Sequence, residues 1–391
     1  GASGGQTITN TGRFAMVHRH RVSAHLLLIG LLALGGLLAG AGPAAAQSAA
    51  RLYTVEGVPV DVTAGSAVAA REQAYAEGQR AAFRMLMEKL TPESVHGRLP
   101  AAPSGAALDA LVQGFEVRDE RASGVRYIAR MVVRFNPAEV QALLARADLP
   151  AVTMPSQPVL VLPLWQSPES GLLLWEEPNP WRDAWERASL GQALVPLVVP
   201  LADAADLVGI SAEQAEAGEA ERLSAMARRY GAVASLVAVA ATAEAGGQQA
   251  LDIRFTRYDA SGEPETRSER VAAATGESGQ ELFARAVQQV SGRLDADWKN
   301  ASAVRPGVEN RLSVVTAVSG LEEWTALRRK LAEIGMIRRQ DLVSLSRGQA
   351  EIVLWYAGQP EQLRVALAQR GLSLAADPFA TGGEIWRLSP K

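Results

Sequence analysis

The chain has 391 residues, a formal net charge of −3 at pH 7 and no cysteine. Without thiols it can form no disulfide, no cysteine nucleophile and no lipid anchor attached to cysteine. The near-neutral charge gives no electrostatic reason to expect a nucleic-acid partner. Stability therefore has to come from buried apolar cores, which requires full-sized domains.

The first 46 residues are typical of a bacterial secretory leader. Arg19 and Arg21 form a basic start after Met16, a leucine-rich apolar stretch covers residues 24–42, and small residues follow up to Ala46. This order predicts export to the periplasm with cleavage near Ala46, and no stable membrane anchor afterwards. The alternative is an uncleaved anchor, because the apolar stretch is nearly long enough to span a bilayer.

Two proline-containing stretches, around residues 150–158 and 301–308, are typical of linkers. They divide the rest of the chain into three regions, at residues 51–149, 157–300 and 309–391. The expected fold class is therefore α+β, with three consecutive small α/β-type domains.

The first domain is expected to contain a strand, a long helix and a β-hairpin. Residues 52–62 predict the strand and residues 64–90 predict the helix, in which apolar side chains recur at helical spacing. Residues 115–121 and 125–135 predict the hairpin, closed by a turn that contains Gly124.

Arginines alternate with apolar residues along the second strand of this hairpin. The predicted register places Glu116 opposite Arg130 and Glu120 opposite Arg126, and such cross-strand pairs are mildly stabilising. An anion-binding stripe that also includes Arg134 is the other interpretation. Pairing accounts for two of the three arginines, and we prefer it.

The middle domain is expected to have a mixed sheet with helices. Residues 159–164, 193–199 and 233–241 are apolar on both faces, which predicts central parallel strands. Residues 251–256 and 265–273 predict outer strands. The expected helices cover residues 180–188, a short segment near Ala204, residues 212–230 and a closing segment that reaches Trp298.

The sequence of the third domain predicts the order strand, helix, strand, strand, helix, strand. Ser319 and Glu322 are expected to form a capping box at its first helix. This order is typical of a ferredoxin-like βαββαβ sandwich. The segments are residues 312–318, 321–334, 337–346, 349–357, 360–370 and the chain from Leu372 onward.

Several segments of the chain occur together in a known family. They are Tyr53 to Val58, Val159 to Trp165, Asn179 to Trp181 with Trp185, Ala227 to Ala232, and Leu354 to Gly358. With them the chain resembles an exported proteobacterial family classed as domain of unknown function two thousand and sixty-six, over nearly its whole length after the leader. That resemblance implies no catalytic residue.

Two domains also resemble parts of envelope proteins. The first domain is similar to the amino-terminal domain of flagellar assembly protein T, and the middle domain is similar to the amino-terminal domain of the periplasmic protein TolB. Both belong to envelope assemblies, so these likenesses favour a binding function over catalysis, by analogy of fold.

Side chains that carry catalysis are scarce after the leader. His96 is the one histidine there, in a loop rich in proline and glycine, which is more typical of a solvated histidine than of a general base. The sequence has no nucleophile elbow, phosphate loop or calcium loop. We expect no metal site and no cofactor. A pair of carboxylates that meet in space remains possible, with Glu176 and Glu177 as the adjacent pair beside aromatic residues.

Tryptophan is concentrated in one region, at Trp165, Trp175, Trp181 and Trp185. The loop after Trp165 follows a predicted parallel strand, where open α/β sheets tend to bind ligands. Indole rings there could stack on sugars or anchor a protein interface. Trp181 and Trp185 share one face of a helix capped by Asn179, so we favour packing over binding for them. For Trp175 both interpretations have equal support.

The sequence therefore leads to one expected function and two alternatives. The expected function is that of a non-catalytic periplasmic protein that binds an unidentified protein partner of the envelope. The first alternative is a receptor for cell-wall glycan or another small ligand, using the tryptophan-rich region. A carboxylate-dependent hydrolase has the least support.

Overall fold

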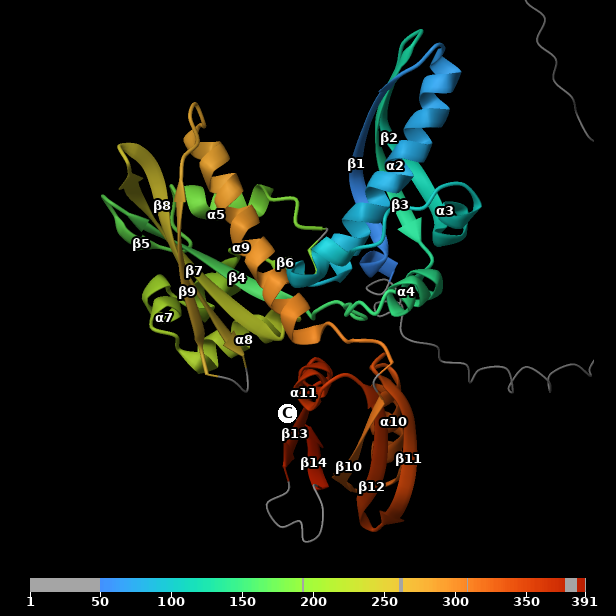
Figure 1. The fold of residues 1–391 in the computed structure, drawn as a ribbon. Coiled ribbons are helices and arrows are strands. Elements are labelled where there is room, and N and C mark those ends of the chain that lie inside the picture. The colour runs from blue at the N-terminus through green and yellow to red at the C-terminus, as the bar shows by residue number, and fades with distance from the viewer. Residues whose placement is uncertain (1–49, 192, 260–262, 308, 377–384, 391) are drawn as a thin grey trace, which may run out of the picture. The chain divides into compact units, whose positions relative to one another are not determined.

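The computed structural model contains three separate β-sheets with helices (Figure 1). The expected leader and its cleavage site near Ala46 lie outside the described residues. None of the described helices is long and apolar enough to cross a membrane. The fold class is α+β, as expected from the sequence. The structure describes residues 50–191, 193–259, 263–307, 309–376 and 385–390.

The first domain is a three-stranded antiparallel sheet, in the order β1-β3-β2, with a long helix packed against it. Ser66 caps that helix, α2, by accepting a hydrogen bond from the Ala69 amide at 3.2 Å. A Cβ at Gly78 would collide with Met131 and Val60, so the glycine lets α2 lie close to the sheet. The elements are β1 (Thr54–Thr63), α2 (Ala67–Leu90), a 3-10 helix (Glu93–Arg98), α3 (Ala106–Leu111), β2 (Val112–Ala122), β3 (Arg126–Phe135) and α4 (Pro137–Arg146).

The predicted register of the β2–β3 hairpin is wrong by two residues. Arg118, not Glu116, lies opposite Arg130, and Val117 lies opposite Met131. The turn is tighter than predicted, because the Ser123 amide donates to the Arg126 carbonyl at 2.8 Å, and this shifts the register by three residues beside the turn. An irregularity between Arg118 and Arg121, where Asp119 adopts a φ of +52°, reduces the shift to two. A slip of two residues keeps the side chains from Phe115 to Arg118 on their predicted face of the sheet.

All three arginines of β3 nevertheless have carboxylate partners. Arg126 pairs with Asp61 of β1 at 2.6 Å, and Arg130 lies 3.9 Å from Asp119. Arg134 pairs with Glu116. The ion-pair interpretation of this row therefore agrees with the structure, although the partners differ from those predicted.

The middle domain is a mixed sheet in the order β5-β4-β7-β8-β9, with β6 beside β4. Strand β4 runs parallel to both β6 and β7, as predicted for central strands. The elements are β4 (Val159–Ser167), β5 (Gly171–Leu173), α5 (Pro180–Arg187), β6 (Leu197–Val198), α6 (Ala204–Gly209), α7 (Ala212–Glu216), α8 (Ala220–Arg229), β7 (Ala234–Ala245), β8 (Gln248–Asp259), β9 (Glu265–Ala272) and α9 (Gly279–Ser302).

The single helix predicted over residues 212–230 is two helices, α7 and α8. They are separated at Gly218, which has a φ of +72° and lies against the ring of Tyr258. A side chain there would be strained and would collide with that ring, so the break depends on glycine.

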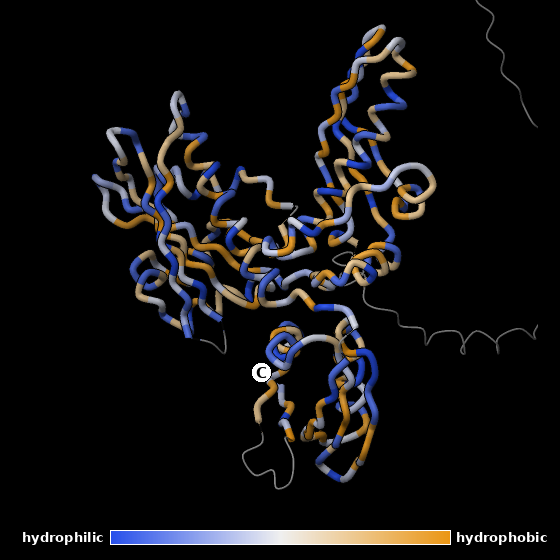
Figure 2. Tube along the Cα trace, in the orientation of Figure 1, coloured by the Kyte–Doolittle hydropathy of each residue, from blue (hydrophilic) through white to orange (hydrophobic). Residues whose placement is uncertain are grey.

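Helices cover both faces of the middle sheet, and the alternation of side chains along β4 separates two cores. Leu160, Leu162 and Leu164 pack with α7 and α8, whereas Val161 and Trp165 pack with α5 and α9. Figure 2 shows the apolar character of these central strands beside the mostly polar β9.

The third domain has the predicted βαββαβ order and one additional strand. The sheet order is β11-β12-β10-β14-β13, in which β14 is inserted between β10 and β13 and runs parallel to β10. The capping box predicted from Ser319 and Glu322 is wrong, because the N-cap of α10 is Gly320, which has no side-chain cap, and the Ser319 hydroxyl donates to Glu323 at 2.6 Å instead. The elements are β10 (Glu309–Val318), α10 (Leu321–Ala332), β11 (Ile337–Ser346), β12 (Gly348–Ala357), α11 (Pro360–Ala368), β13 (Leu372–Ala376) and β14 (Ile385–Pro390).

Candidate partner-binding site

Three of the four tryptophans singled out in the sequence lie in one buried aromatic cluster. The rings of Trp181 and Trp185 are 5.5 Å apart between centroids, and Phe283 of α9 lies 5.4 Å from Trp165 and 6.2 Å from Trp181. All four rings are buried, and Nε1 of Trp181 donates to the Ala238 carbonyl at 2.9 Å. These indoles join α5 and α9 to the sheet, and their faces are not available to a ligand.

Trp175 is not part of this cluster. It packs against the core formed with α7 and α8, on the other face of the sheet. Its Nε1 donates to the Ile210 carbonyl at 2.7 Å, and the guanidinium of Arg182 lies 5.7 Å from its ring. The structure therefore does not bring the four tryptophans together into one surface.

The other side chains considered for chemistry have structural partners. Nε2 of His96 lies 3.2 Å from the Thr91 carbonyl oxygen. Glu176 accepts hydrogen bonds from the Leu174 and Trp175 amides, both at 3.2 Å, and so holds the loop after β5. No group of three potential metal-ligating side chains occurs among the residues that the structure describes.

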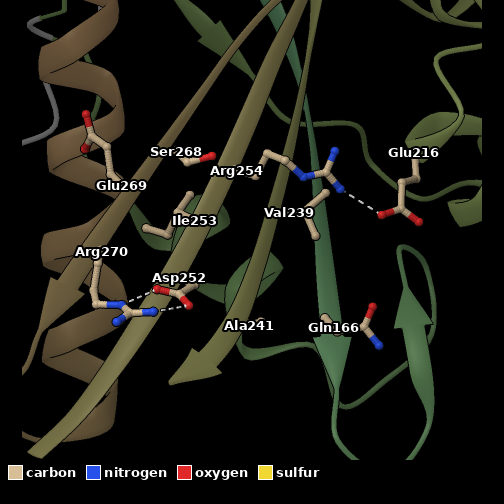
Figure 3. A pocket seen from close by; sticks show the side chains of 10 residues that line it. All are labelled: Gln166, Glu216, Val239, Ala241, Asp252, Ile253, Arg254, Ser268, Glu269 and Arg270. Atoms are coloured by element: carbon tan, nitrogen blue, oxygen red, sulfur yellow. Dashed lines mark hydrogen bonds and ion pairs between the residues drawn. The ribbon is translucent and has the colours of Figure 1, made fainter. Parts of the chain in front are cut away.

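A hollow of about 640 Å³ lies over β7, β8 and β9 (Figure 3). Its charged side chains bind one another, since Arg270 donates two hydrogen bonds to Asp252, at 2.6 and 2.7 Å, and Arg254 lies 2.8 Å from Glu216. The hydrogen bonds from Arg270 hold the pKa of Asp252 below its ordinary value. A charged ligand would have to displace these internal partners, which makes the hollow a weak candidate site.

Helix α6 has an inverted distribution of polar and apolar side chains. Within Ala204–Gly209, all of which the structure describes, Asp206 is the one buried residue. Leu207 and Val208 are 52% and 82% exposed, and Leu201, in the loop before the helix, is 78% exposed. Burial of a carboxylate and exposure of aliphatic side chains both oppose folding unless something compensates. We call Leu201, Leu207 and Val208 the α6 surface.

A polar network compensates the burial of Asp206. Its carboxylate accepts a hydrogen bond from the Tyr230 hydroxyl at 2.6 Å and from Nε of Arg229 at 3.0 Å. It also accepts from the Asp203 amide at 3.3 Å, which completes a capping box at the start of α6. A fully satisfied buried network of this kind rigidifies the segment that it holds.

The same network holds the loop that carries Leu201. The Leu201 amide donates to the Tyr230 hydroxyl at 2.9 Å, and burial raises the pKa of that tyrosine. Ala202 adopts a φ of +57°, which is rare for a residue with a side chain and costs about 1–3 kcal/mol. The surrounding hydrogen bonds therefore maintain a strained loop in one conformation and keep Leu201 in solvent.

The surroundings of the α6 surface are acidic. Arg229 pairs with both Asp203 and Asp206, so one cation faces two carboxylates. The hydrogen bond from the Asp206 amide, together with Arg229, lowers the pKa of Asp203 and keeps it ionised. The carboxylates between positions 201 and 221 are Asp203, Asp206, Glu213, Glu216, Glu219 and Glu221. Three arginines pair with four of them, since Arg222 binds Glu219 and Arg254 binds Glu216 in addition to the two pairs of Arg229, so carboxylates outnumber their arginine partners.

This arrangement is suited to recognition. Rigid, preorganised apolar side chains cost little conformational entropy on association. Sequence reasoning expected a short helix near Ala204 but missed the α6 surface. The available signal was the capping box itself, because it turns Asp206 towards the domain and leaves Leu207 and Val208 on the remaining face.

Comparisons with known proteins add little to this description. No family model matches the chain, and no curated protein matches it. Among solved structures, the crystal structure of lipoprotein GNA1162 from Neisseria meningitidis is similar at 19% sequence identity and a TM-score of 0.25. The match covers 36% of this chain and 98% of that one.

Proposed function

We propose that this protein acts by binding a protein partner through the α6 surface, outside the cytoplasm, and not by catalysis. The observation that carries the proposal is the inversion of α6, in which a network around buried Asp206 holds Leu201, Leu207 and Val208 in solvent. Exposed apolar surface on a rigid support favours an interaction site. The secretory leader expected over residues 1–46 motivates the location.

The charge around the α6 surface favours a protein partner over a lipid bilayer. Asp203 precedes α6 in the chain and Glu213 follows it, and anionic lipid headgroups would repel both. The expected partner presents an apolar pocket with basic side chains at its rim, because such a rim complements the acidic surroundings.

Site-specific photo-crosslinking in cells tests this proposal. A photoreactive amino acid at Val208 is expected to give one discrete adduct with a protein. The matched control is the same amino acid at Leu321, which is 74% exposed and belongs to α10 of the third domain. The Val208 adduct is expected to weaken at least tenfold when Asp206 is changed to Ala, because α6 then loses its support.

Two results would contradict the proposal. One is the absence of any adduct from Val208 while the protein is folded and present at normal levels. The other is the same set of adducts from Val208 and from Leu321, because collisions without a specific site would give that pattern.

A further inference from the structure

A second apolar surface of the middle domain lies in a groove between α5 and α9. Pro180, Ala184 and Ala188 line it from the α5 side at four-residue spacing, and Phe283 and Ala284 line it from α9. Its volume is about 810 Å³. That is within the range of about 300–1,000 Å³ usual for binding sites.

The rim of this groove is basic and polar. Arg187 and Arg285 line it together with Gln280 and Gln288, and none of the described side chains that line it is acidic. Arg285 is held by Glu277 at 2.7 Å. Arg187 has Asp183 as its carboxylate partner at 3.7 Å, a loose contact in solvent that a second carboxylate can replace at little cost.

The groove and the α6 surface are therefore complementary in shape and in charge. One is a concave apolar surface with arginines at its rim, and the other is a set of protruding aliphatic side chains in acidic surroundings. They cannot meet within one molecule. Helix α6 is tied to α8 through Arg229 and through the bond from Arg222 to the Gly209 carbonyl, on the face of the sheet opposite α5 and α9.

We propose that the partner of the α6 surface is the α5–α9 groove of a second copy of this chain. This inference rests on the proposed function and specifies its partner. Since the two surfaces differ, the contact is heterologous, with Leu201, Leu207 and Val208 of one copy entering the groove of the next. Such head-to-tail contacts leave a free α6 surface at one end and a free groove at the other, so they form open filaments or closed rings.

Sedimentation velocity of the purified protein at increasing concentration tests this inference. The wild-type protein is expected to form species larger than a dimer, and to form fewer of them as salt rises, because salt screens the charges around the contact. Val208→Asp is expected to abolish this association by placing a charge on the α6 surface. Ala284→Glu is expected to remove it from the groove side, by adding a carboxylate at an exposed helical position.

The decisive measurement mixes the two variants. Val208→Asp retains an intact groove and Ala284→Glu retains an intact α6 surface, so an equimolar mixture is expected to form a dimer and nothing larger. A symmetric contact between identical surfaces would give no such complementation. Leu321→Asp and Gln289→Glu add the same charges at exposed positions outside the two surfaces, and both are expected to associate like the wild type. Circular dichroism verifies that every variant is folded.

The outcomes separate this inference from the proposed function. A wild-type protein that stays monomeric to about 100 times the concentration in the cell overturns self-association. If Val208 then crosslinks to a different protein, the proposed function stands with another partner. A mixture of the two variants that remains monomeric, although the wild type associates, overturns the α6-to-groove contact.

Discussion

Helices α5 and α6 of the middle domain are both short and both begin at a capping side chain, but α5 buries apolar side chains and α6 buries a charged one. Helix α5 buries Trp181, Ala184 and Trp185 and exposes Asp183, Glu186 and Arg187. Helix α6 buries Asp206 and exposes Leu207 and Val208. Apolar burial therefore stabilises α5, whereas hydrogen bonds and ion pairs stabilise α6.

This difference separates side chains that maintain the fold from side chains that are available to a partner. The conspicuous aromatic residues of α5 fill the interior. The aliphatic residues of α6 contribute little to the core, and the partner binding proposed above would account for their exposure. The following predictions test this contrast.

The largest effect on stability is expected from Trp181→Ala. Trp181 is fully buried, contacts two aromatic rings and donates a hydrogen bond to Ala238. Its loss is expected to lower the free energy of unfolding by about 3–5 kcal/mol, measured by urea denaturation with circular dichroism. A loss below about 1 kcal/mol would show that the aromatic cluster does not stabilise the domain.

A smaller loss of stability is expected from Asp206→Ala. The change leaves the Tyr230 hydroxyl and Nε of Arg229 without their acceptor, at a cost of about 1–3 kcal/mol. Amide hydrogen exchange over residues 203–210 is expected to accelerate. Asp109→Ala removes an exposed aspartate from the first turn of α3 and serves as the control. Equal exchange in both variants would mean that the network does not support α6.

The ion pair between Glu277 and Arg285, beside the α5–α9 groove, should make stability depend on pH in the acid range. The Arg285 guanidinium, followed by the Ala274 amide, lowers the pKa of Glu277 from 4.5 to about 2. This carboxylate therefore stabilises the fold fully above pH 4.5, and its contribution declines as the pH falls towards 2. The stability difference between wild type and Glu277→Gln is expected to shrink over that interval in thermal melts. A difference that is constant across it would contradict the pairing with Arg285.

The smallest effect on stability is expected from Val208→Ser. Because Val208 is 82% exposed, the free energy of unfolding should change by no more than about 0.5 kcal/mol. The same change should weaken association in sedimentation velocity. A large loss of stability would place Val208 among the residues that maintain the fold and would remove the contrast between the two helices.

Much of the architecture could be predicted because it depends on local patterns. Residues 159–164 and 233–241 are apolar on both faces, which is typical of central parallel strands. Asn179 and Asp203 begin helices because a side-chain oxygen accepts from a backbone amide two or three residues later. The break at Gly218 was missed, because one glycine within a helical pattern does not reveal a ring lying against it.

The candidate site could not be predicted, because it depends on residues distant in sequence. Asp206 becomes an interior residue through Arg229 and Tyr230, more than twenty positions later. A helix of six residues has too few turns for its apolar pattern to indicate which side faces the core. In the same way, the register of the β2–β3 hairpin followed the tight turn closed by Ser123 and Arg126 and the irregularity at Asp119, and not the charge pairs read from the sequence.

By itself, the sequence determined the α+β fold class, the order of most elements and the absence of thiol chemistry, since each follows from composition or short-range periodicity. The tertiary structure alone decided which of the notable side chains are interior and which are exposed. Burial depends on the partners that a residue meets after the chain has folded. Three tryptophans therefore lie in the core, whereas a leucine and a valine beside a buried aspartate lie in solvent.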